Sequence, residues 1–123
     1  MLLKDFYSVE SLTQLEQDKY VAEIKLNNTH EVFRGHFPGN PVTPGVCMIQ
    51  IVKELTEHIL NKKLQLSKSS NVKFMALINP EVNPNLRLEL DISDVEESKH
   101  KVKNTTYFGE TVALKLVSVY QDK

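Results

Sequence analysis

The chain has 123 residues, of which 41% are hydrophobic and 25% charged, so we expect one globular domain over residues 1–123. Its formal net charge of −1 argues against a general affinity for nucleic acid or anionic lipid, and its apolar runs are too short to span a membrane. Polar residues interrupt the first segment too early for a signal peptide, and the single cysteine, Cys47, fits a reducing compartment, so we expect a cytoplasmic protein.

The first elements along the chain are strands. Residues 5–12 predict a short strand, and residues 19–27 predict a clearer one. In the second strand, apolar side chains recur at every other position, the period of a half-buried strand: Tyr20, Ala22, Ile24 and Leu26. A polar turn then leads through residues 30–34 into a loop.

The segment from residue 35 to residue 45 contains three of the five prolines and three of the four glycines, which indicates a loop of defined shape. A helix follows from Gly45 to about Leu60. Pro44 suits its first turn and Thr43 could cap it. The first half is apolar nearly all round and the second half is amphipathic, so we expect the N-terminal half to be buried on every side.

Residues 61–70 are polar and basic and predict a connecting loop. Four strands are expected after it, at residues 71–78, 86–92, 100–108 and 111–120. One helix cannot cover both faces of such a sheet, so the pattern predicts an α+β fold in which an antiparallel sheet wraps around one central helix. The uncovered edge of the sheet predicts a dimer at least.

The loop and the helix start suggest chemistry. His36 stands in the proline-framed loop, and an imidazole exchanges protons near neutral pH. A helix N-terminus at Gly45 offers free N–H groups to a polarisable oxygen. The other histidines, His30, His58 and His100, lie on polar stretches and are expected to be solvated. Without paired ligand spacings or a glycine-rich phosphate loop, we expect no metal and no cofactor.

Residues 35–46, Gly-His-Phe-Pro-Gly-Asn-Pro-Val-Thr-Pro-Gly-Val, resemble the G-H-F-P-x-x-P-[IV]-x-P-G-V signature of the hotdog-fold 3-hydroxyacyl-[acyl-carrier-protein] dehydratases. A weaker similarity covers residues 72–84, where Asn85 and Leu86 replace the Gly-Asp of the family turn. The resemblance implies a single hotdog domain, with residues 45–60 as the central helix.

The resemblance also implies an activity, the dehydration of (3R)-3-hydroxyacyl thioesters to trans-2-enoyl thioesters in fatty acid or related lipid biosynthesis. In this interpretation His36 is the general acid–base that acts on the C2 proton, and the Gly45 N–H polarises the thioester carbonyl. The residues expected to hold the acyl chain are Phe37, Pro38, Val46, Ile49 and Phe74. The expected partner is acyl carrier protein with a phosphopantetheine-linked substrate. Cations that could meet it are Arg34, Lys62, Lys63 and Lys68.

One departure from the family pattern concerns residue 50, where the family has a glutamate or aspartate and this chain has Gln50. An amide forms hydrogen bonds but cannot release a proton as an acid. A loss of about 10²–10⁴-fold in dehydration is expected if nothing replaces the carboxylate. Glu54, one helical turn further on, would have to reach back about 6 Å to replace it.

Two alternatives remain open at this point. The chain could be a catalytically impaired hotdog subunit that binds acyl carrier protein and pairs with an active relative. It could also be an acyl thioesterase, although Gln50 weakens that interpretation as well. The assembly is accordingly expected to be a homodimer, a higher oligomer or a hotdog heteromer.

Overall fold

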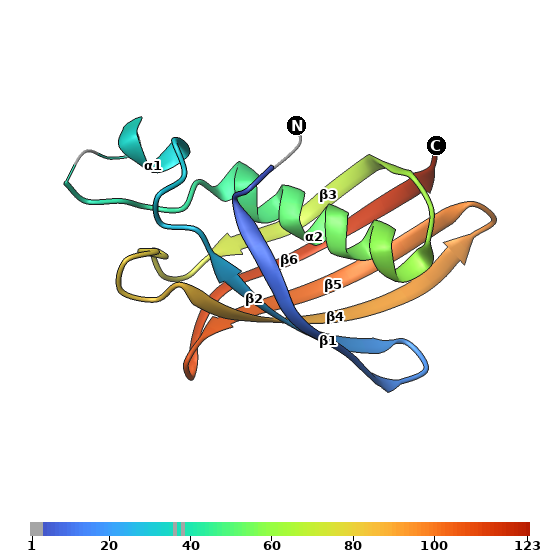
Figure 1. The fold of residues 1–123 in the computed structure, drawn as a ribbon. Coiled ribbons are helices and arrows are strands. Elements are labelled where there is room, and N and C mark those ends of the chain that lie inside the picture. Colours follow the sequence, from blue (N-terminus) through green and yellow to red (C-terminus); the bar gives the residue numbers. More distant parts are fainter. Residues whose placement is uncertain (1–3, 36, 38) are drawn as a thin grey trace.

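Six strands form one antiparallel sheet that curves around a single long helix (Figure 1). The computed structural model describes residues 4–35, 37 and 39–123. The elements are β1 (Tyr7–Glu16), β2 (Lys19–Leu26), α1 (Val32–Gly35), α2 (Gly45–Leu60), β3 (Leu64–Phe74), β4 (Asn85–Glu96), β5 (Lys99–Phe108) and β6 (Thr111–Asp122).

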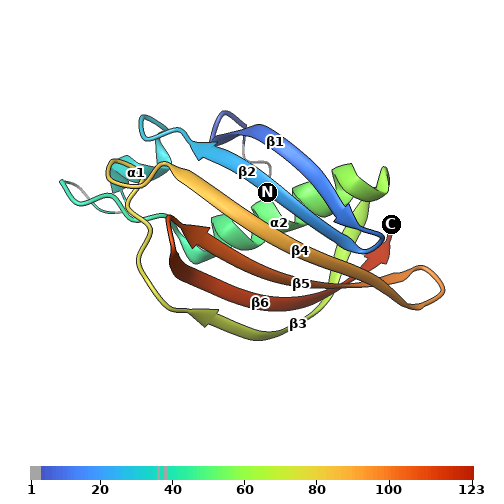
Figure 2. The same ribbon diagram turned by 90° about the horizontal axis from the view of Figure 1, so that it is seen from below.

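The strand order in the sheet is β1-β2-β4-β5-β6-β3, so β1 and β3 are the edge strands. Helix α2 runs along one face of the sheet, as two perpendicular views show (Figures 1 and 2). The predicted α+β arrangement, one antiparallel sheet around one central helix, is confirmed. Within the described residues, no helix is long and apolar enough to cross a membrane.

The core lies between α2 and the inner face of the sheet. Side chains on the central strands alternate between buried and exposed, as the period of two requires. The buried set includes Leu86, Leu88, Leu90 and Ile92 from β4 and Met48, Ile51, Val52 and Leu55 from α2. Full burial of such a side chain contributes about 1.5–3 kcal/mol, which holds α2 against the sheet.

Helix α2 begins at Gly45 and ends at Leu60, as predicted, but its N-terminal cap differs. Pro44 occupies the cap position with an extended backbone, and no side chain caps the helix. The prediction that Thr43 is the cap is therefore wrong. The Thr43 N–H donates to the Ile78 carbonyl at 2.9 Å, which holds Thr43 outside the helix.

The N-terminal half of α2 is less buried than its composition predicts. Cys47 and Met48 are buried, but Val46 is 62% exposed, and Ile49 and Gln50 are half-buried. The expectation of burial on every side is wrong for the single chain, because the sheet covers only one side of the helix.

The polar stretch at residues 61–70 is not a loop. Leu64–Phe74 forms the edge strand β3, which pairs with β6. Of residues 64–69, Leu64 is buried and the other five are exposed, so the strand lacks the apolar alternation of a half-buried one. The strand expected at residues 71–78 is the end of β3 and an irregular segment after it.

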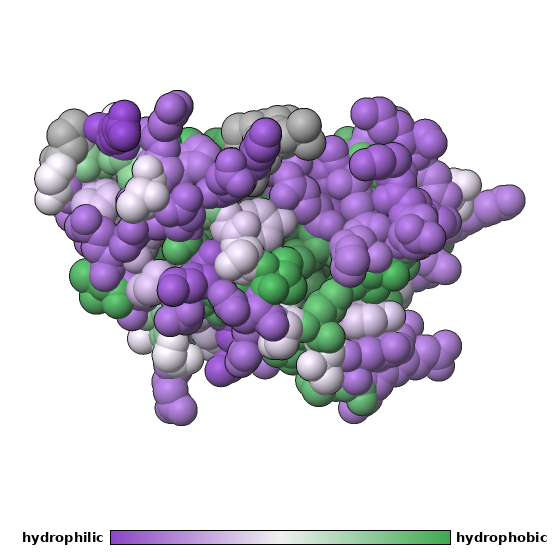
Figure 3. Space-filling model, in the orientation of Figure 1, coloured by the Kyte–Doolittle hydropathy of each residue, from purple (hydrophilic) through white to green (hydrophobic). Residues whose placement is uncertain are grey.

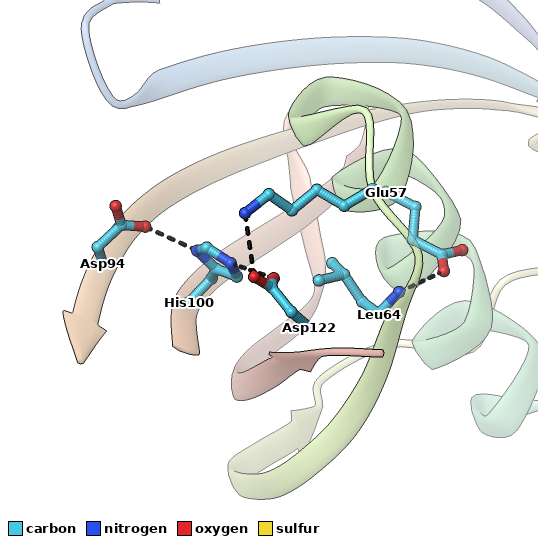
Figure 4. A network of polar contacts seen from close by, with 6 residues as sticks. Glu57, Leu64, Asp94, His100 and Asp122 are labelled. Carbon is cyan, nitrogen blue, oxygen red and sulfur yellow. Dashed lines mark hydrogen bonds and ion pairs between the residues drawn. The ribbon is translucent and has the colours of Figure 1, made fainter. Parts of the chain in front are cut away.

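His100 is buried, so the expectation that it is solvated is wrong. Its Nδ1 lies 2.7 Å from Asp94 Oδ1 and its Nε2 lies 2.8 Å from Asp122 Oδ1. Lys62, just after α2, donates to the other Asp122 oxygen at 3.1 Å (Figure 4). These contacts join the ends of α2, β4, β5 and β6, and they compensate the burial of the imidazole.

Candidate active site

The predicted acid–base residue His36 and the predicted acyl-chain residue Pro38 lie outside the described residues. Their neighbours form a tight turn. The Asn40 N–H donates to the Phe37 carbonyl at 2.9 Å, and the Phe37 N–H donates to the Asn40 carbonyl at 3.2 Å. Within this turn Gly39 has a φ of +74°, a conformation that favours glycine. The two backbone hydrogen bonds therefore hold Phe37 and Asn40 close together.

A cavity of about 290 Å³ lies beside this turn. Phe37 and Pro41 line it from the loop, Phe33 and Arg34 line it from α1, and Glu81 lines it from the turn before β4. Arg34 and Phe37, predicted to meet the carrier and the acyl chain, therefore share one cavity.

The start of α2 presents free backbone donors. The first hydrogen bonds of the helix run from the Cys47 and Met48 N–H groups to the Pro44 carbonyl, at 3.0 and 3.3 Å. The N–H groups of Gly45 and Val46 precede these bonds and have no acceptor within the helix. Together with the positive end of the helix dipole, they can stabilise a negative charge on an oxygen that approaches the helix start.

Phe74, the last residue of β3, covers this helix start. A Cβ atom added to Gly45 would lie 2.5 Å from Phe74 Cζ, closer than real Cβ contacts come. Glycine at residue 45 thus lets the aromatic ring pack directly on the first turn of α2. The structure therefore brings together two of the predicted site residues from separate elements.

Gln50 belongs to a hydrogen-bonded network that links α2 to β1. Its Nε2 donates to Glu54 Oε2 at 3.0 Å, and the Tyr7 hydroxyl donates to Glu54 Oε1 at 2.8 Å. All three side chains are half-buried. Burial, and then the hydrogen bond and negative charge of Glu54, raise the pKa of the Tyr7 hydroxyl far above its usual value. Tyr7 therefore stays protonated and is a hydrogen-bond donor to Glu54 at any physiological pH.

The predicted acyl-chain residues are open to solvent in the single chain. Phe37 is 51% exposed, Val46 62% and Phe74 56%, whereas a tunnel for an apolar chain needs buried walls. Hydrophobic surface interrupts the hydrophilic surface on the face that carries α2 (Figure 3). Further exposed apolar side chains on or just after β3 are Leu66, Met75 and Leu77.

The four cations that were predicted to meet the carrier protein do not lie together in the structure. Lys62 is paired with Asp122 at the far end of α2, whereas Arg34 lies beside the loop and Lys63 and Lys68 are exposed. The prediction missed Tyr7, because no sequence pattern connects residue 7 with residues 50 and 54. The spacing of four between Gln50 and Glu54 does predict their contact on one helix face.

Comparison with known proteins gives a family match over most of the chain. The family model described as "ApeI-like: ApeI dehydratase" matches residues 12–113. The chain is similar to the 3-hydroxyacyl-[acyl-carrier-protein] dehydratase FabZ of Caulobacter sp. (strain K31), at 32% identity over 88 residues, which covers 66% of this chain and 54% of that protein. It is also similar to the FabZ of Rhizorhabdus wittichii, at 29% identity over 115 residues, which covers 85% and 72%. The first of these matches spans about half the length of the curated relative.

Among solved structures, the chain is similar to a chain of the dehydratase heterocomplex ApeI:P from Xenorhabdus doucetiae. The TM-score is 0.74 at 24% identity, with 93% of this chain and 96% of that chain covered. This similarity concerns the fold, and it confirms the predicted hotdog architecture.

Proposed function

The chain belongs to the ApeI-like dehydratase family, and from this premise we propose that it dehydrates (3R)-3-hydroxyacyl thioesters to trans-2-enoyl thioesters. The proposed carrier is acyl carrier protein, which the names of the FabZ relatives include. The observation that supports the proposal most is that the segment after His36 in the sequence contains the reciprocal Phe37–Asn40 hydrogen bonds and ends at the free N–H groups of Gly45 and Val46.

The proposed chemistry uses two groups of this segment. His36 takes the C2 proton, and the electrons of that C–H bond form the C2=C3 double bond as the C3–O bond breaks. Negative charge that develops on the thioester oxygen is stabilised by the Gly45 N–H and the α2 dipole. Loss of one such donor typically costs about 3 kcal/mol of the barrier.

The proposed acyl-chain site uses the apolar residues around the helix start. Phe74 and Val46 flank Gly45, Ile49 lies one helical turn after Val46, and Phe37 and Pro38 belong to the loop that leads there. The exposure of Val46 and Phe74 supports a dimer, because a second subunit would bury these side chains and close the walls of the site.

The test is an assay of purified protein with a 3-hydroxyacyl-loaded carrier protein, in which mass spectrometry follows the loss of water. Wild type should form the enoyl product, and a His36→Ala variant with the same circular dichroism spectrum should not. Equal rates for the two proteins would refute the assignment. Release of free carrier thiol without an enoyl product would instead indicate a thioesterase.

A second candidate function is a carrier-binding subunit that depends on an active hotdog partner. Two observations favour it, namely that residue 50 is an amide and that apolar side chains stay exposed beside the helix start. The similar structure from Xenorhabdus doucetiae is that of a dehydratase heterocomplex, so an assembly of two different subunits has a precedent in a protein of similar fold. This function predicts carrier binding without turnover, and activity only after a second hotdog subunit is added.

A further inference from the structure

We propose that Glu54 and Tyr7 are positioning residues that turn the Gln50 amide so that its oxygen faces the hydroxyl group of the substrate. The proposal rests on the proposed dehydration. It adds that residue 50 accepts a hydrogen bond from the 3-hydroxyl and that His36 returns its proton to the departing oxygen.

The orientation of the amide follows from the chemistry of its partner. The Gln50 side-chain atom 3.0 Å from Glu54 Oε2 faces a carboxylate, which only accepts hydrogen bonds. The Gln50 atom that faces Glu54 is therefore the nitrogen of the NH₂ group, and the amide oxygen points away from Glu54. The Tyr7 hydroxyl donates to the other Glu54 oxygen at 2.8 Å and holds the carboxylate in this orientation from β1.

The Tyr7 hydroxyl of the network keeps its proton. The pKa of Tyr7 is raised by burial and by Glu54, so the phenol remains a donor. Other titratable groups share cavities with the network. Glu57, His58, Lys62 and Lys63 lie in one cavity with Glu54, and Asp5 and Lys25 lie in one with Tyr7.

An amide oxygen at residue 50 has consequences for the proton balance. Gln50 cannot protonate the leaving hydroxyl, because an amide does not act as an acid, and one N–H of its NH₂ group donates to Glu54. The proton that His36 takes from C2 is then the one that leaves with the hydroxyl as water, which restores the neutral imidazole. Catalysis thus needs one titrating group, and kcat/KM should rise with pH through one pKa without a falling limb near neutrality.

The experiment compares Glu54→Gln and Tyr7→Phe with the control Glu97→Gln, an equivalent change at an exposed turn residue. In Glu54→Gln the new amide can offer either its NH₂ group or its oxygen to residue 50, so the Gln50 amide is free to flip. We expect kcat to fall about tenfold in Glu54→Gln with little change in KM, the rate equivalent of one lost hydrogen bond. In Tyr7→Phe, kcat should fall by less than in Glu54→Gln. Neither variant should change the shape of the pH profile.

A swap variant, Gln50→Glu with Glu54→Gln, provides the complementary test. It keeps a carboxylate–amide pair but places the acid at residue 50, as in the family pattern. We expect faster dehydration than in wild type and a new falling limb in the pH profile, because a carboxylic acid then protonates the leaving group. Restored or increased activity in the swap also shows that loss in Glu54→Gln is not a folding defect.

Two results would overturn the proposal. If Glu54→Gln is as inactive as His36→Ala, then Glu54 is itself the acid. If Glu54→Gln leaves kcat and KM unchanged, the network positions nothing. Failure of the proposed function appears separately, as wild type without turnover. The side-chain NH₂ resonances of Gln50 still test the orientation in that case, and they should shift in Tyr7→Phe and stay unchanged in Glu97→Gln.

Discussion

The ring of Phe74 packs on Gly45, so that the end of edge strand β3 covers the first turn of helix α2. The two residues are 29 positions apart in the chain and belong to two separate parts of the predicted site. A Cβ atom at residue 45 would lie 2.5 Å from Phe74 Cζ, so the ring keeps its place on the helix start only while residue 45 is a glycine. The contact also places an aromatic wall beside the N–H groups proposed to bind the thioester oxygen.

Gly45→Ala should separate activity from stability. The added methyl group displaces the end of the Phe74 side chain, which is 56% exposed and can turn toward solvent, so the free energy of unfolding should change by about 1 kcal/mol or less. Dehydration should fall by about tenfold or more, because the methyl group occupies space beside the donor N–H. Denaturant unfolding and the carrier-protein assay measure the two effects.

Gln50→Glu alone should give a faster enzyme with an altered pH profile. The new carboxylate lies about 3 Å from Glu54, where the Gln50 amide now binds, and two carboxylates this close share one proton at neutral pH. The pair then holds an acid that can protonate the departing hydroxyl, worth roughly 10²-fold or more. An unchanged or slower rate across the pH range would contradict this role for residue 50.

Val46→Asp should yield a monomer. Val46 is 62% exposed in the single chain, so a charge there costs little in folding but opposes burial against a second subunit. Val95→Asp, at a side chain that is 48% exposed near the end of the interior strand β4, is the matched control. Light scattering should show a smaller mass for Val46→Asp only. A monomeric wild type would disprove the dimer.

His100→Phe should lower stability at neutral pH and make stability less sensitive to acid. Hydrogen bonds from His100, and then from Lys62, lower the pKa of Asp122 below its usual value. A carboxyl group with a lowered pKa in the folded state stabilises the fold above its unfolded pKa of about 3.9, and the stabilisation disappears as the pH falls through the lower folded value. The difference between wild type and variant should therefore be full at neutral pH and narrow below about pH 4. Thermal unfolding checks this, with the exposed His58→Phe as control.

Lys115→Glu should stabilise the sheet. Lys73 of β3 and Lys115 of β6 are directly opposite each other, and both are exposed. Like charges at opposed positions repel, so reversal of one should contribute about 0.2–1 kcal/mol in low salt and less in high salt. Lys115→Gln should give an intermediate value in the same unfolding experiment, and an effect independent of salt would exclude the electrostatic explanation.

The parts of the fold that could be predicted are those whose side chains face the core. Leu86 to Ile92 alternate because one face of β4 is buried, and Gly45 starts α2 because Pro44 ends the extended segment before it. The first part of edge strand β3, residues 64–70, could not be predicted, because it is held by backbone pairing with β6 and lacks an alternating apolar face. The burial of His100 could not be predicted for a similar reason, because its partner Asp122 is remote in the sequence.

The candidate site shows the same division. The motif placed Gly45 at a helix start, and the spacing of four placed Glu54 beside Gln50. Neither pattern contains information on Tyr7, which reaches the pair only because β1 passes α2 in three dimensions. The roles of His36, Gly45 and Gln50 remain predictions for the assays above.

The edge ladders are irregular. The β1–β2 and β3–β6 pairings carry two register shifts each, whereas the interior β4–β5 and β5–β6 pairings carry one each and the β2–β4 pairing carries none. Edge strands that are paired irregularly are poor templates for the addition of a strand from another chain. A concentrated solution of the folded protein should consequently resist fibril growth through the free edges of β1 and β3.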